Sequence, residues 1–377
     1  MKVTVLQENL ARGLSVVSRA VSPRSTLPVL SNILIASDEG RLRLSATNLE
    51  LGITCWIAAR IDEEGSTTVP ARTFADLVNT LPGDQVQLML DVKTQSLHVK
   101  GGTSNNDIKC IDAQEFPPLP VPEMDGAVQL NVADFKEMIQ QVAFAASTDE
   151  ARPVLMGVLL HVEKDKVTMV AADGFRLSVR KAQLSQAVAH PINVIIPARA
   201  LNELARVATD SEEPIYMVVP KNRGQVLFRV KDVEVVSQLI DGTFPDYQQI
   251  IPRNYKSRTL VSTASLLKAC KQAEIFAREG SNVARFDIKQ ANGEMQPSEV
   301  EISATSEETG KNETIVEATV DGGSVLIAFN VKFLREALEV IKTPNVALET
   351  SAANAPGVVK PVGDDNFLHV IMPMHLG

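Results

Sequence analysis

The stretch "TTVPARTFADLVNTLP" runs from Thr67 to Pro82, and about 125 residues later the chain reads "NVIIPARALNELARVA" from Asn193 to Ala208. Both begin as a short apolar strand, pass through Pro-Ala-Arg and continue with apolar residues three and four positions apart. This spacing is typical of an amphipathic helix. Proline is tolerated in the first turn of a helix, where the backbone N–H groups have no partner within the helix. The motif therefore predicts the same strand-to-helix junction twice.

A larger unit that contains this junction occurs three times. Three segments read as a strand followed by a helix: "VTVLQENLARGLSVVSRAV" from Val3, "VQLNVADFKEMIQQVAFAA" from Val128 and "RTLVSTASLLKACKQAEIFA" from Arg258. A third version of the junction is "VLIAFNVKFLREALEVI" from Val325, where Phe-Asn replaces Ala-Arg. Repeats of this length indicate repeated domains. We expect three of them, at residues 1–122, 128–252 and 256–377.

Each unit is also doubled internally, since a strand, a helix and three alternating segments occur twice within it. The chain should therefore hold six helices, with roughly four strands for each. The strands alternate apolar and polar residues, as in "LRLSA" from Leu42 and "LFRV" from Leu227. Such alternation suits antiparallel sheets with one solvated face. The expected fold class is α+β, with two helices of each domain packed on antiparallel sheets.

The formal net charge of −9 argues by itself against a nucleic-acid ligand. The distribution of the charged residues along the chain, however, favours a nucleic-acid ligand. Twelve basic and nine acidic residues lie in the six predicted helices, which cover 8–20, 72–80, 134–146, 198–208, 265–279 and 331–342. If the apolar faces pack on the sheets, the polar faces form one basic surface on an acidic molecule, which attracts phosphates without reading sequence. The alternative is that a small excess of basic residues arises by chance.

Catalytic and metal-binding motifs are missing. The sequence holds no GxSxG, HExxH or GxGxxG, and "KGGTSNN" from Lys100 does not complete a phosphate-binding P-loop. The histidines have no ligand spacing, and Cys55, Cys110 and Cys270 lie far apart, so buried reduced thiols are expected rather than a zinc site. We expect no catalysis, no metal and no cofactor.

No run approaches the roughly 18 apolar residues of a membrane span, and the N-terminal residues lack the features of a signal peptide. We therefore expect a cytoplasmic protein that does not contact a membrane.

Six motifs in order carry a family resemblance: "RSTLPVLSNILI" at 24–35, "TTVPAR" at 67–72, "AADGFRL" at 171–177, "DGTFPDY" at 241–247, "FNVKFL" at 329–334 and "VIMPM" at 370–374. The chain resembles the bacterial sliding-clamp family, the beta subunits of DNA polymerase III, over essentially its whole length. The resemblance implies the DNA-clamp fold, with each chain half of a six-domain ring. It also implies a processivity factor: a homodimer that encircles duplex DNA and has no catalysis of its own.

The partners that the resemblance implies are double-stranded DNA, the DNA polymerase III catalytic subunit, the clamp-loader complex, and other DNA polymerases and repair proteins with clamp-binding motifs. Family DNA contacts correspond to Arg24 and Arg72, and we add Arg199 by its position and charge. Near 149–154 some members carry paired tyrosines. This chain has Arg152 as the basic candidate there.

The resemblance also implies a hydrophobic pocket that binds a short peptide of each partner, between the second and third domains. The matching positions are Leu155, Ala172, Gly174, Phe175, Arg176, Leu177, Pro245, Ile250, Asn330, Phe333, Val370, Ile371, Met372, Pro373, Met374 and Leu376. Methionine and aliphatic side chains make an adaptable cleft. The alternative for Val370 and Ile371 is a final strand in the core. The chain departs from common family residues at Phe175, at His375 and at Asn354–Pro356.

In the family, domain one of one chain meets domain three of the other. Ile275 and Phe276 match the apolar interface positions and would face a strand near Ile108. The alternative is that both residues only continue their helix. Two other functions stay open at this point: an enzyme built on an internal repeat, and a scaffold that binds only peptides.

Overall fold

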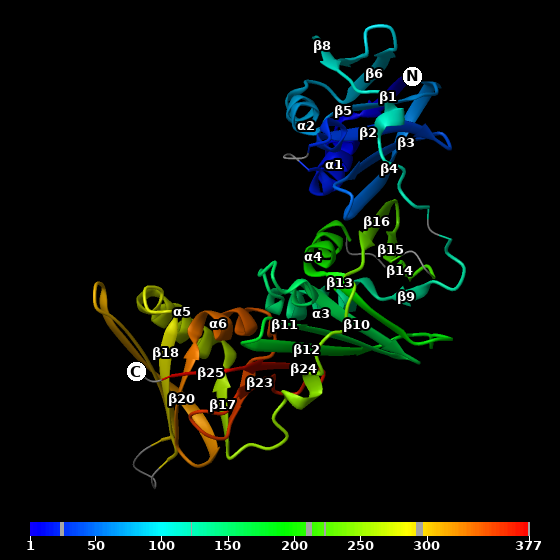
Figure 1. The fold of residues 1–377 in the computed structure, drawn as a ribbon. Coiled ribbons are helices and arrows are strands. Elements are labelled where there is room, and N and C mark those ends of the chain that lie inside the picture. The colour runs from blue at the N-terminus through cyan, green and yellow to red at the C-terminus, as the bar shows by residue number, and fades with distance from the viewer. Residues whose placement is uncertain (23–25, 122, 209–212, 222–223, 292–296, 376–377) are drawn as a thin grey trace. The chain divides into compact units, whose positions relative to one another are not determined.

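The computed structural model describes residues 1–377 apart from 23–25, 122, 209–212, 222–223, 292–296 and 376–377. Contacts divide the chain into two compact units (Figure 1). Unit 1 consists of Met1–Ala133 and Arg199–Leu239, and unit 2 of Asp134–Ala198 and Ile240–Gly377. The middle third of the chain contributes to both units.

Six α-helices lie in the described part of the chain, at the predicted places to within a few residues. They are α1 (Gln7–Val17), α2 (Ala71–Thr80), α3 (Val132–Val142), α4 (Ala198–Val207), α5 (Thr263–Ala277) and α6 (Val331–Glu339). Short 3₁₀ turns at Ser18–Ala20 and Ala143–Ala145 continue α1 and α3. These turns explain why the predicted helices extend further.

The Pro-Ala-Arg junction has the predicted order with one correction. Pro70 ends a strand and is the N-cap of α2, and α4 likewise begins at Ala198, after Pro197. The prolines therefore precede the first helical turn instead of lying inside it. Strand β5 pairs with β2 and forms a bridge to Ile111 through Thr68. Pro70, which has no N–H group to donate, lies at the end of this strand, a position that proline tolerates.

Unit 1 is built on one antiparallel sheet, in the order β8-β7-β6-β1-β4-β16-β15-β14-β9, with β2, β3 and β5 joined to it through β4. Its strands are β1 (Lys2–Leu6), β2 (Asn32–Asp38), β3 (Arg41–Thr47), β4 (Leu51–Glu63), β5 (Ser66–Pro70), β6 (Gln85–Asp91), β7 (Ser96–Gly101), β8 (Ser104–Lys109), β9 (Val128–Leu130), β14 (Ile215–Val218), β15 (Gln225–Val230) and β16 (Val233–Gln238). The pair β4–β16 joins the first predicted domain to part of the second.

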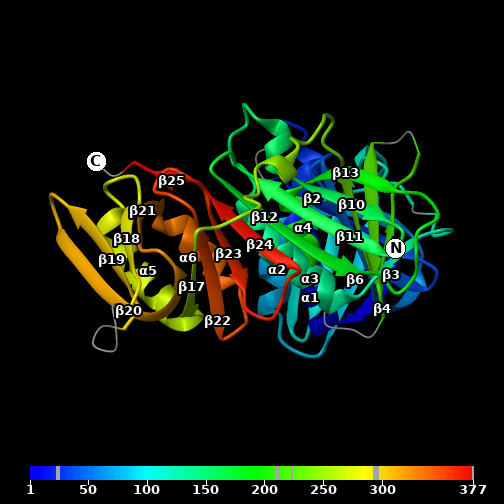
Figure 2. The same ribbon diagram turned by 90° about the horizontal axis from the view of Figure 1, so that it is seen from below.

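Unit 2 is built on a second antiparallel sheet, in the order β13-β10-β11-β12-β24-β23-β22-β17-β20-β19-β18-β21-β25 (Figure 2). Its strands are β10 (Gly157–Glu163), β11 (Lys166–Ala172), β12 (Arg176–Gln183), β13 (Ile192–Pro197), β17 (Ser257–Ser262), β18 (Val283–Lys289), β19 (Glu299–Ser306), β20 (Gly310–Gly322), β21 (Val325–Asn330), β22 (Asn345–Thr350), β23 (Gly357–Pro361), β24 (Phe367–Ile371) and β25 (Pro373–Met374). The pair β12–β24 joins residues of the second and third predicted domains.

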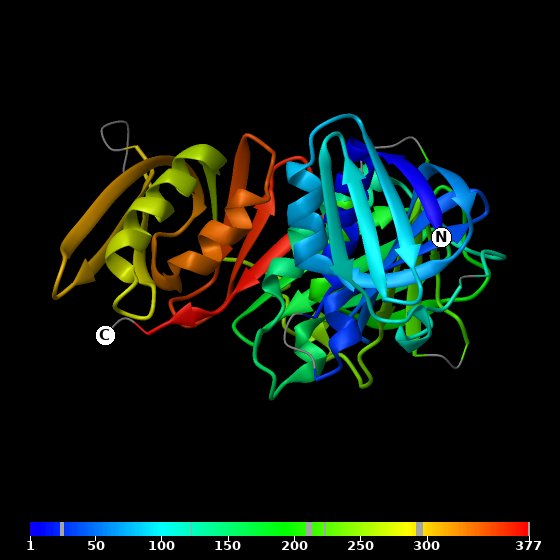
Figure 3. The ribbon, with the colours of Figure 1, turned by 90° about the horizontal axis from the view of Figure 1, so that it is seen from above.

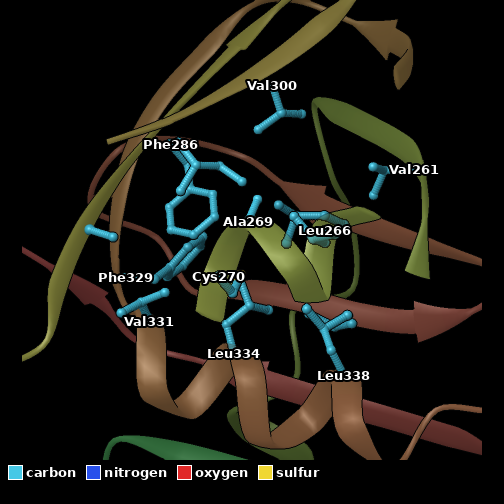
Figure 4. Close-up of a cluster of buried hydrophobic side chains, with 14 of the residues drawn as sticks. Val261, Leu266, Ala269, Cys270, Phe286, Val300, Phe329, Val331, Leu334 and Leu338 are labelled. Carbon is cyan, nitrogen blue, oxygen red and sulfur yellow. The ribbon is translucent and has the colours of Figure 1, made fainter. Parts of the chain in front are cut away.

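The core of the third repeat shows why its helices are amphipathic. Helices α5 and α6 lie side by side (Figure 3), and α5 packs on β19 and β20. Leu266 of α5 and Leu334 of α6 are completely or almost completely buried beside Phe286 and Phe329, whose rings meet edge to face at 5.6 Å (Figure 4). Burying each such side chain stabilises the fold by about 1.5–3 kcal/mol. The apolar stripe of each of these two helices is thus buried in the core, whereas the charged residues of the helices are half-buried or exposed.

Candidate functional site

The predicted DNA-facing arginines that the structure describes are accessible. Arg72, in the first turn of α2, has a side chain that is 94% exposed, and its nearest acidic partner, Asp76, is 3.7 Å away. Arg199 is exposed at the second position of α4. Arg24 lies outside the described residues. An exposed ion pair at this distance contributes little, so Arg72 can exchange Asp76 for a phosphate at small cost.

Several other basic residues of the helices are paired with acidic residues of the helices. In unit 1, Glu203 accepts hydrogen bonds from Arg19 at 3.3 Å and Arg206 at 2.8 Å. In unit 2, Arg335 lies 2.6 Å from Glu274 and 2.7 Å from Glu339. Pairing leaves the small basic excess of the helices unchanged, but it weakens the field that these cations produce at a distance.

Arg152 has a local role that its sequence position does not reveal. Its Nε donates to Asp149 Oδ2 at 2.9 Å, and its Nη1 donates to the backbone oxygen of Asp173 at 2.8 Å. The guanidinium therefore braces the turn between β11 and β12. The side chain is still 41% exposed, which leaves it accessible to a ligand.

Four of the predicted pocket residues meet in one apolar cluster of unit 2. Ala172, Leu177 and Val370 are buried in it, and Leu155 packs against it. The cluster combines strands β11, β12 and β24 with a 3₁₀ turn at Pro153–Met156. These side chains come from separate stretches of the sequence and together form one apolar surface, which we call the apolar floor.

Exposed apolar side chains are also among the predicted pocket residues. Phe175 is 57% exposed, Ile250 41% and Met372 37%. The backbone N–H of Met372 donates to the backbone oxygen of Phe175 at 2.9 Å, so these two residues are neighbours although almost 200 positions separate them. Pro245 is exposed as well. Exposed apolar groups next to an apolar floor are suited to bind the side chains of a peptide.

Strand register explains how this site is assembled. Within the β12–β24 pair, Arg176 is opposite Ile371 and Leu177 is opposite Val370. Val370 and Ile371 are almost fully buried, as expected for a strand in the core. Gly174 has a φ of 93°, a left-handed conformation that favours glycine, and it allows the tight turn before β12.

Arg176 connects three elements of the site. Its Nε donates to Asp173 at 3.0 Å, its Nη2 donates to the backbone oxygen of Phe144 at 2.8 Å, and its Nη1 is paired with Glu336 of α6. The guanidinium also lies over the ring of Phe333 at 4.2 Å. The side chain is only 8% exposed, so its role is to hold the turn against α6.

The remaining pocket residues lie on the side of the third repeat. Asn330 caps α6, with its side chain accepting the N–H groups of Lys332 and Phe333. Pro373 and Met374 form β25 beside Phe329 and Ala328 of β21. Both are half-buried. Leu376 lies outside the described residues.

The comparisons with known proteins agree with this architecture. Family models match in succession the N-terminal domain of the DNA polymerase III beta subunit at residues 1–120, its central domain at 129–246 and its C-terminal domain at 248–375. The beta sliding clamp of Staphylococcus aureus (strain Mu50 / ATCC 700699) is 36% identical over 383 residues, with 99% of each chain covered. The chain belongs to the DNA polymerase III beta subunit family.

Solved structures of this sliding-clamp family match the whole chain. The DNA polymerase sliding clamp of Bacillus subtilis has a TM-score of 0.93 at 30% identity, and 100% of each chain is covered. The beta subunits of Pseudomonas aeruginosa and Thermotoga maritima each have a TM-score of 0.89, at 28% and 27% identity, also with full coverage. The α+β clamp fold predicted from the repeats and motifs is therefore confirmed.

The dimer residues predicted from the sliding-clamp family lie in different environments. Ile275 of α5 is 56% exposed, whereas Phe276 is half-buried against the core of the third repeat. Ile108 is buried within unit 1, on β8, the strand that ends its sheet. Ile275 is thus the most exposed of the three residues and offers the most apolar surface to a second chain.

The cysteines of this clamp chain are free thiols. Cys55 and Cys270 are buried and Cys110 is half-buried. Burial raises the pKa of Cys55 to about 11 and also raises the pKa values of Cys110 and Cys270, so all three are protonated at neutral pH. Within the described residues, no group of three or more His, Cys, Asp or Glu could hold a metal ion. No helix in the same part of the chain has the length and apolar character that crossing a bilayer requires.

One notable residue of the site was missed by sequence reasoning. His369 of β24 is completely buried, with its Nδ1 2.7 Å from Ser178 Oγ and its ring stacked on Phe144 at 5.6 Å between centroids. Its Nε2 has no hydrogen-bond partner among the described residues. Burial, with a contribution from the charge of Arg176, lowers the pKa of His369 to about 3. The only sequence signal was its inward position in an alternating strand.

Proposed function

We propose that this chain is a DNA polymerase processivity factor that works as a ring-shaped homodimer. The ring encircles duplex DNA, slides along it without sequence specificity and tethers the replicative polymerase. The observation that carries the proposal is the match to sliding clamps over the full length of both chains. We further propose that each chain contributes three domains, at 1–122, 128–252 and 256–377, so that two chains complete six.

In this proposal, Arg24, Arg72, Arg152 and Arg199 face the DNA. The exposure of Arg72 and Arg199 supports their role, and the small basic excess of the helices fits it too. A topological link needs no tight phosphate contacts, and tight contacts would oppose sliding. Arg152 would bind phosphate only with the part of its guanidinium that Asp149 and Asp173 leave accessible.

The apolar floor and its exposed neighbours in unit 2 are the proposed docking pocket for partner peptides. Phe175, Ile250 and Met372 offer apolar surface to a ligand, and Arg176 fixes the turn that carries Phe175. The partners would be the DNA polymerase III catalytic subunit, the clamp loader, and other polymerases and repair proteins. Because Phe175 is apolar, this pocket should favour an apolar or aromatic peptide residue beside it.

The ring would close where Ile275 and Phe276 of one chain meet the β8 region of the other. Closure would also cover the outer edge of β8, which pairs with no further strand among the described residues. The protein would act in the cytoplasm, without catalysis of its own, and an ATP-driven loader encoded elsewhere would open the ring.

Linearisation of a circular template tests the proposal. The protein, loaded by its clamp loader onto a nicked circular duplex, should remain bound during gel filtration at moderate salt and be lost after one restriction cut. An uncut plasmid of the same size is the control. Equal retention of the protein on the circular and the linearised duplex would contradict a topological link. So would equal dissociation of the protein from both.

A further inference from the structure

The turn that carries Phe175 has a structural counterpart in the first repeat. In the second repeat, Asp173 Oδ1 accepts the N–H groups of Phe175 at 2.9 Å and Arg176 at 3.0 Å. In the first repeat, Asn48 Oδ1 accepts the N–H groups two and three residues further on, at 3.1 and 2.7 Å. The next residue is left-handed in both turns, with a φ of 93° at Gly174 and 77° at Leu49. The two turns are therefore built alike.

The strand beside each turn is also equivalent. Met372 of the second site donates its N–H to the backbone oxygen of Phe175 at 2.9 Å, and Gln238 donates in the same way to Glu50 at 2.8 Å. Strand β16 thus lies beside the turn of the first repeat as β24 lies beside that of the second. Both sites are within single units, the first in unit 1 and the second in unit 2.

A 3₁₀ turn completes both sites. It reads "PVLS" at Pro28–Ser31 in the first repeat and "PVLM" at Pro153–Met156 in the second. The residue before this turn is Leu27 in one case and Arg152 in the other. Arg152 Nη1 lies 3.0 Å from where a Cβ on Gly174 would be. By the equivalence of the two sites, Leu27 and Leu49 occupy the positions of Arg152 and Gly174, so we place both on the same edge of the first site.

Apolar residues replace polar or small ones at this edge of the first repeat. Leu27 is 49% exposed and Leu49 is 52% exposed. Leu49 gains little burial there, and its backbone conformation is one that leucine disfavours and glycine adopts easily. Backbone strain combined with an exposed apolar side chain indicates a residue that serves a ligand rather than the fold.

The floor under this edge is already filled by the chain itself. Gly52 pairs with Val236 as Leu177 pairs with Val370, and a Cβ on Gly52 would lie 2.7 Å from Leu119 Cδ2. Leu119 belongs to the connecting segment and packs with a cluster of Val29, Leu30 and Phe116. Leu119 therefore fills the space over Gly52, and the surface that this site offers a ligand is the exposed edge of Leu27 and Leu49.

We infer that the edge formed by Leu27 and Leu49 is a second, weaker docking site for a short extended apolar peptide. The inference rests on the proposed function, since it extends the peptide chemistry of the unit 2 pocket to the first repeat. The exposed carboxylate of Glu50 stands where Phe175 stands in the second repeat. The preferred peptide therefore carries lysine or arginine next to its apolar residues, and an acidic peptide is disfavoured.

The test is the binding stoichiometry of the full-length protein with the fluorescein-labelled peptide Lys-Leu-Ser-Leu-Phe, and with a control peptide in which glutamate replaces the lysine. Native mass spectrometry and anisotropy titration give the number of peptides per chain and the affinity of each. Wild-type protein should bind two lysine peptides per chain, the second at least tenfold more weakly. The glutamate peptide should bind the weak site at least threefold less tightly than the lysine peptide.

Variants assign each binding event to a site. The double variant Phe175→Asp, Met372→Asp should lose the tighter binding site and bind one peptide per chain. Adding Leu49→Gly should abolish binding of the remaining peptide. Leu49→Gly suits the left-handed backbone, so an unchanged or higher melting temperature shows that it folds, and Leu27→Ser is a second variant for the same site.

The outcomes separate the two ideas. One peptide per chain that the Phe175 and Met372 changes abolish would overturn the second site and leave the proposed pocket intact. One peptide that only Leu49→Gly abolishes would support the second site and contradict the proposed pocket. If the protein binds the peptide at neither site, both the second site and the proposed pocket are overturned.

Discussion

At the scale of single residues, His369 makes stability depend on pH. Its pKa of about 3 in the folded protein lies below the usual 6.5. Between these values the unfolded chain binds a proton that the folded protein does not, so stability is fully present above pH 6.5 and falls as the pH is lowered. We expect a contribution of about 1.4 kcal/mol to be lost at pH 5.5 relative to pH 7.5. Urea unfolding of unit 2 at both pH values measures it.

A matched pair of variants isolates this effect. His369→Gln can keep a hydrogen bond to Ser178 but cannot titrate, so it should lose less stability than the wild type between the two pH values. His190→Gln changes an exposed histidine and should behave like the wild type. Equal pH sensitivity of the wild type and His369→Gln would show that the buried ring does not cause the loss.

Leu49 gives a prediction on backbone strain. A left-handed conformation costs a residue other than glycine about 1–3 kcal/mol, whereas the extra entropy loss of glycine costs about 0.5–1 kcal/mol. Leu49→Gly should therefore stabilise unit 1 by about 0.5–1 kcal/mol, seen as a higher melting temperature. Leu49→Ala keeps the strain and should give no such gain. A gain of the same size in both variants would mean that strain is not the cause.

At the scale of secondary-structure elements, Arg176 holds the β11–β12 turn against α6. Replacing it leaves Asp173 and Glu336, both largely buried, without their main partner. Removing one partner of a buried ion pair typically costs about 3–5 kcal/mol. We expect Arg176→Met to destabilise unit 2 by about 3 kcal/mol in urea unfolding and to weaken peptide binding as well.

Arg180 is the matched control for that variant. It lies on the same strand, is 15% exposed and pairs with one carboxylate, that of Asp364. Arg180→Met should therefore cost less, and it should leave peptide binding unchanged because neither Arg180 nor Asp364 is among the proposed pocket residues. Equal losses from both substitutions would refute the special role of Arg176.

At the scale of the whole molecule, subunit association should depend on Ile275. A charge at this exposed apolar position would have to be buried in the proposed interface without a partner. Ile275→Asp should shift the native mass measured by light scattering from dimer to monomer at micromolar concentration. Ile315→Asp changes a residue of β20 with the same exposure of 56% and should leave the dimer intact. A dimer in both variants would place the interface elsewhere.

DNA binding should depend on salt through the helix arginines. Each phosphate contact contributes about one unit to the slope of log affinity against log salt. Arg72→Ala with Arg199→Ala should reduce that slope by up to about two for a linear duplex in fluorescence anisotropy. Arg60→Ala alters a strand residue with a 71% exposed side chain and serves as the control. An unchanged slope in the double variant would remove both residues from the DNA surface.

Much of the architecture could be predicted from local patterns. The apolar periodicity located all six helices, because a helix places residues three and four apart on one face whatever its neighbours are. The repeated Pro-Ala-Arg junction also predicted the order of strand and helix, with an error of one residue at Pro70. The motifs "AADGFRL" and "VIMPM" pointed to the apolar cluster of unit 2.

The rest depended on contacts between distant parts of the chain. The alternation in β24 indicates that His369 points inward, but not that Ser178 and Phe144 lie beside it. The register between β12 and β24 joins residues almost 200 positions apart and is set only when the two strands pair. Arg152 and Arg176 are equally basic in the sequence. Their different burial follows from which carboxylates and carbonyl groups the fold brings within hydrogen-bond distance.

The sequence by itself determined the threefold repeat, the helices and the family, since each follows from short-range spacing and ordered motifs. Only the tertiary structure decided that strand β24 lies beside β12, that a histidine is buried at their junction, and that the first repeat reproduces the turn of the second with an exposed leucine. The physical reason is that hydrogen-bond partners and burial belong to pairs of segments, and the pairing exists only once the chain has folded.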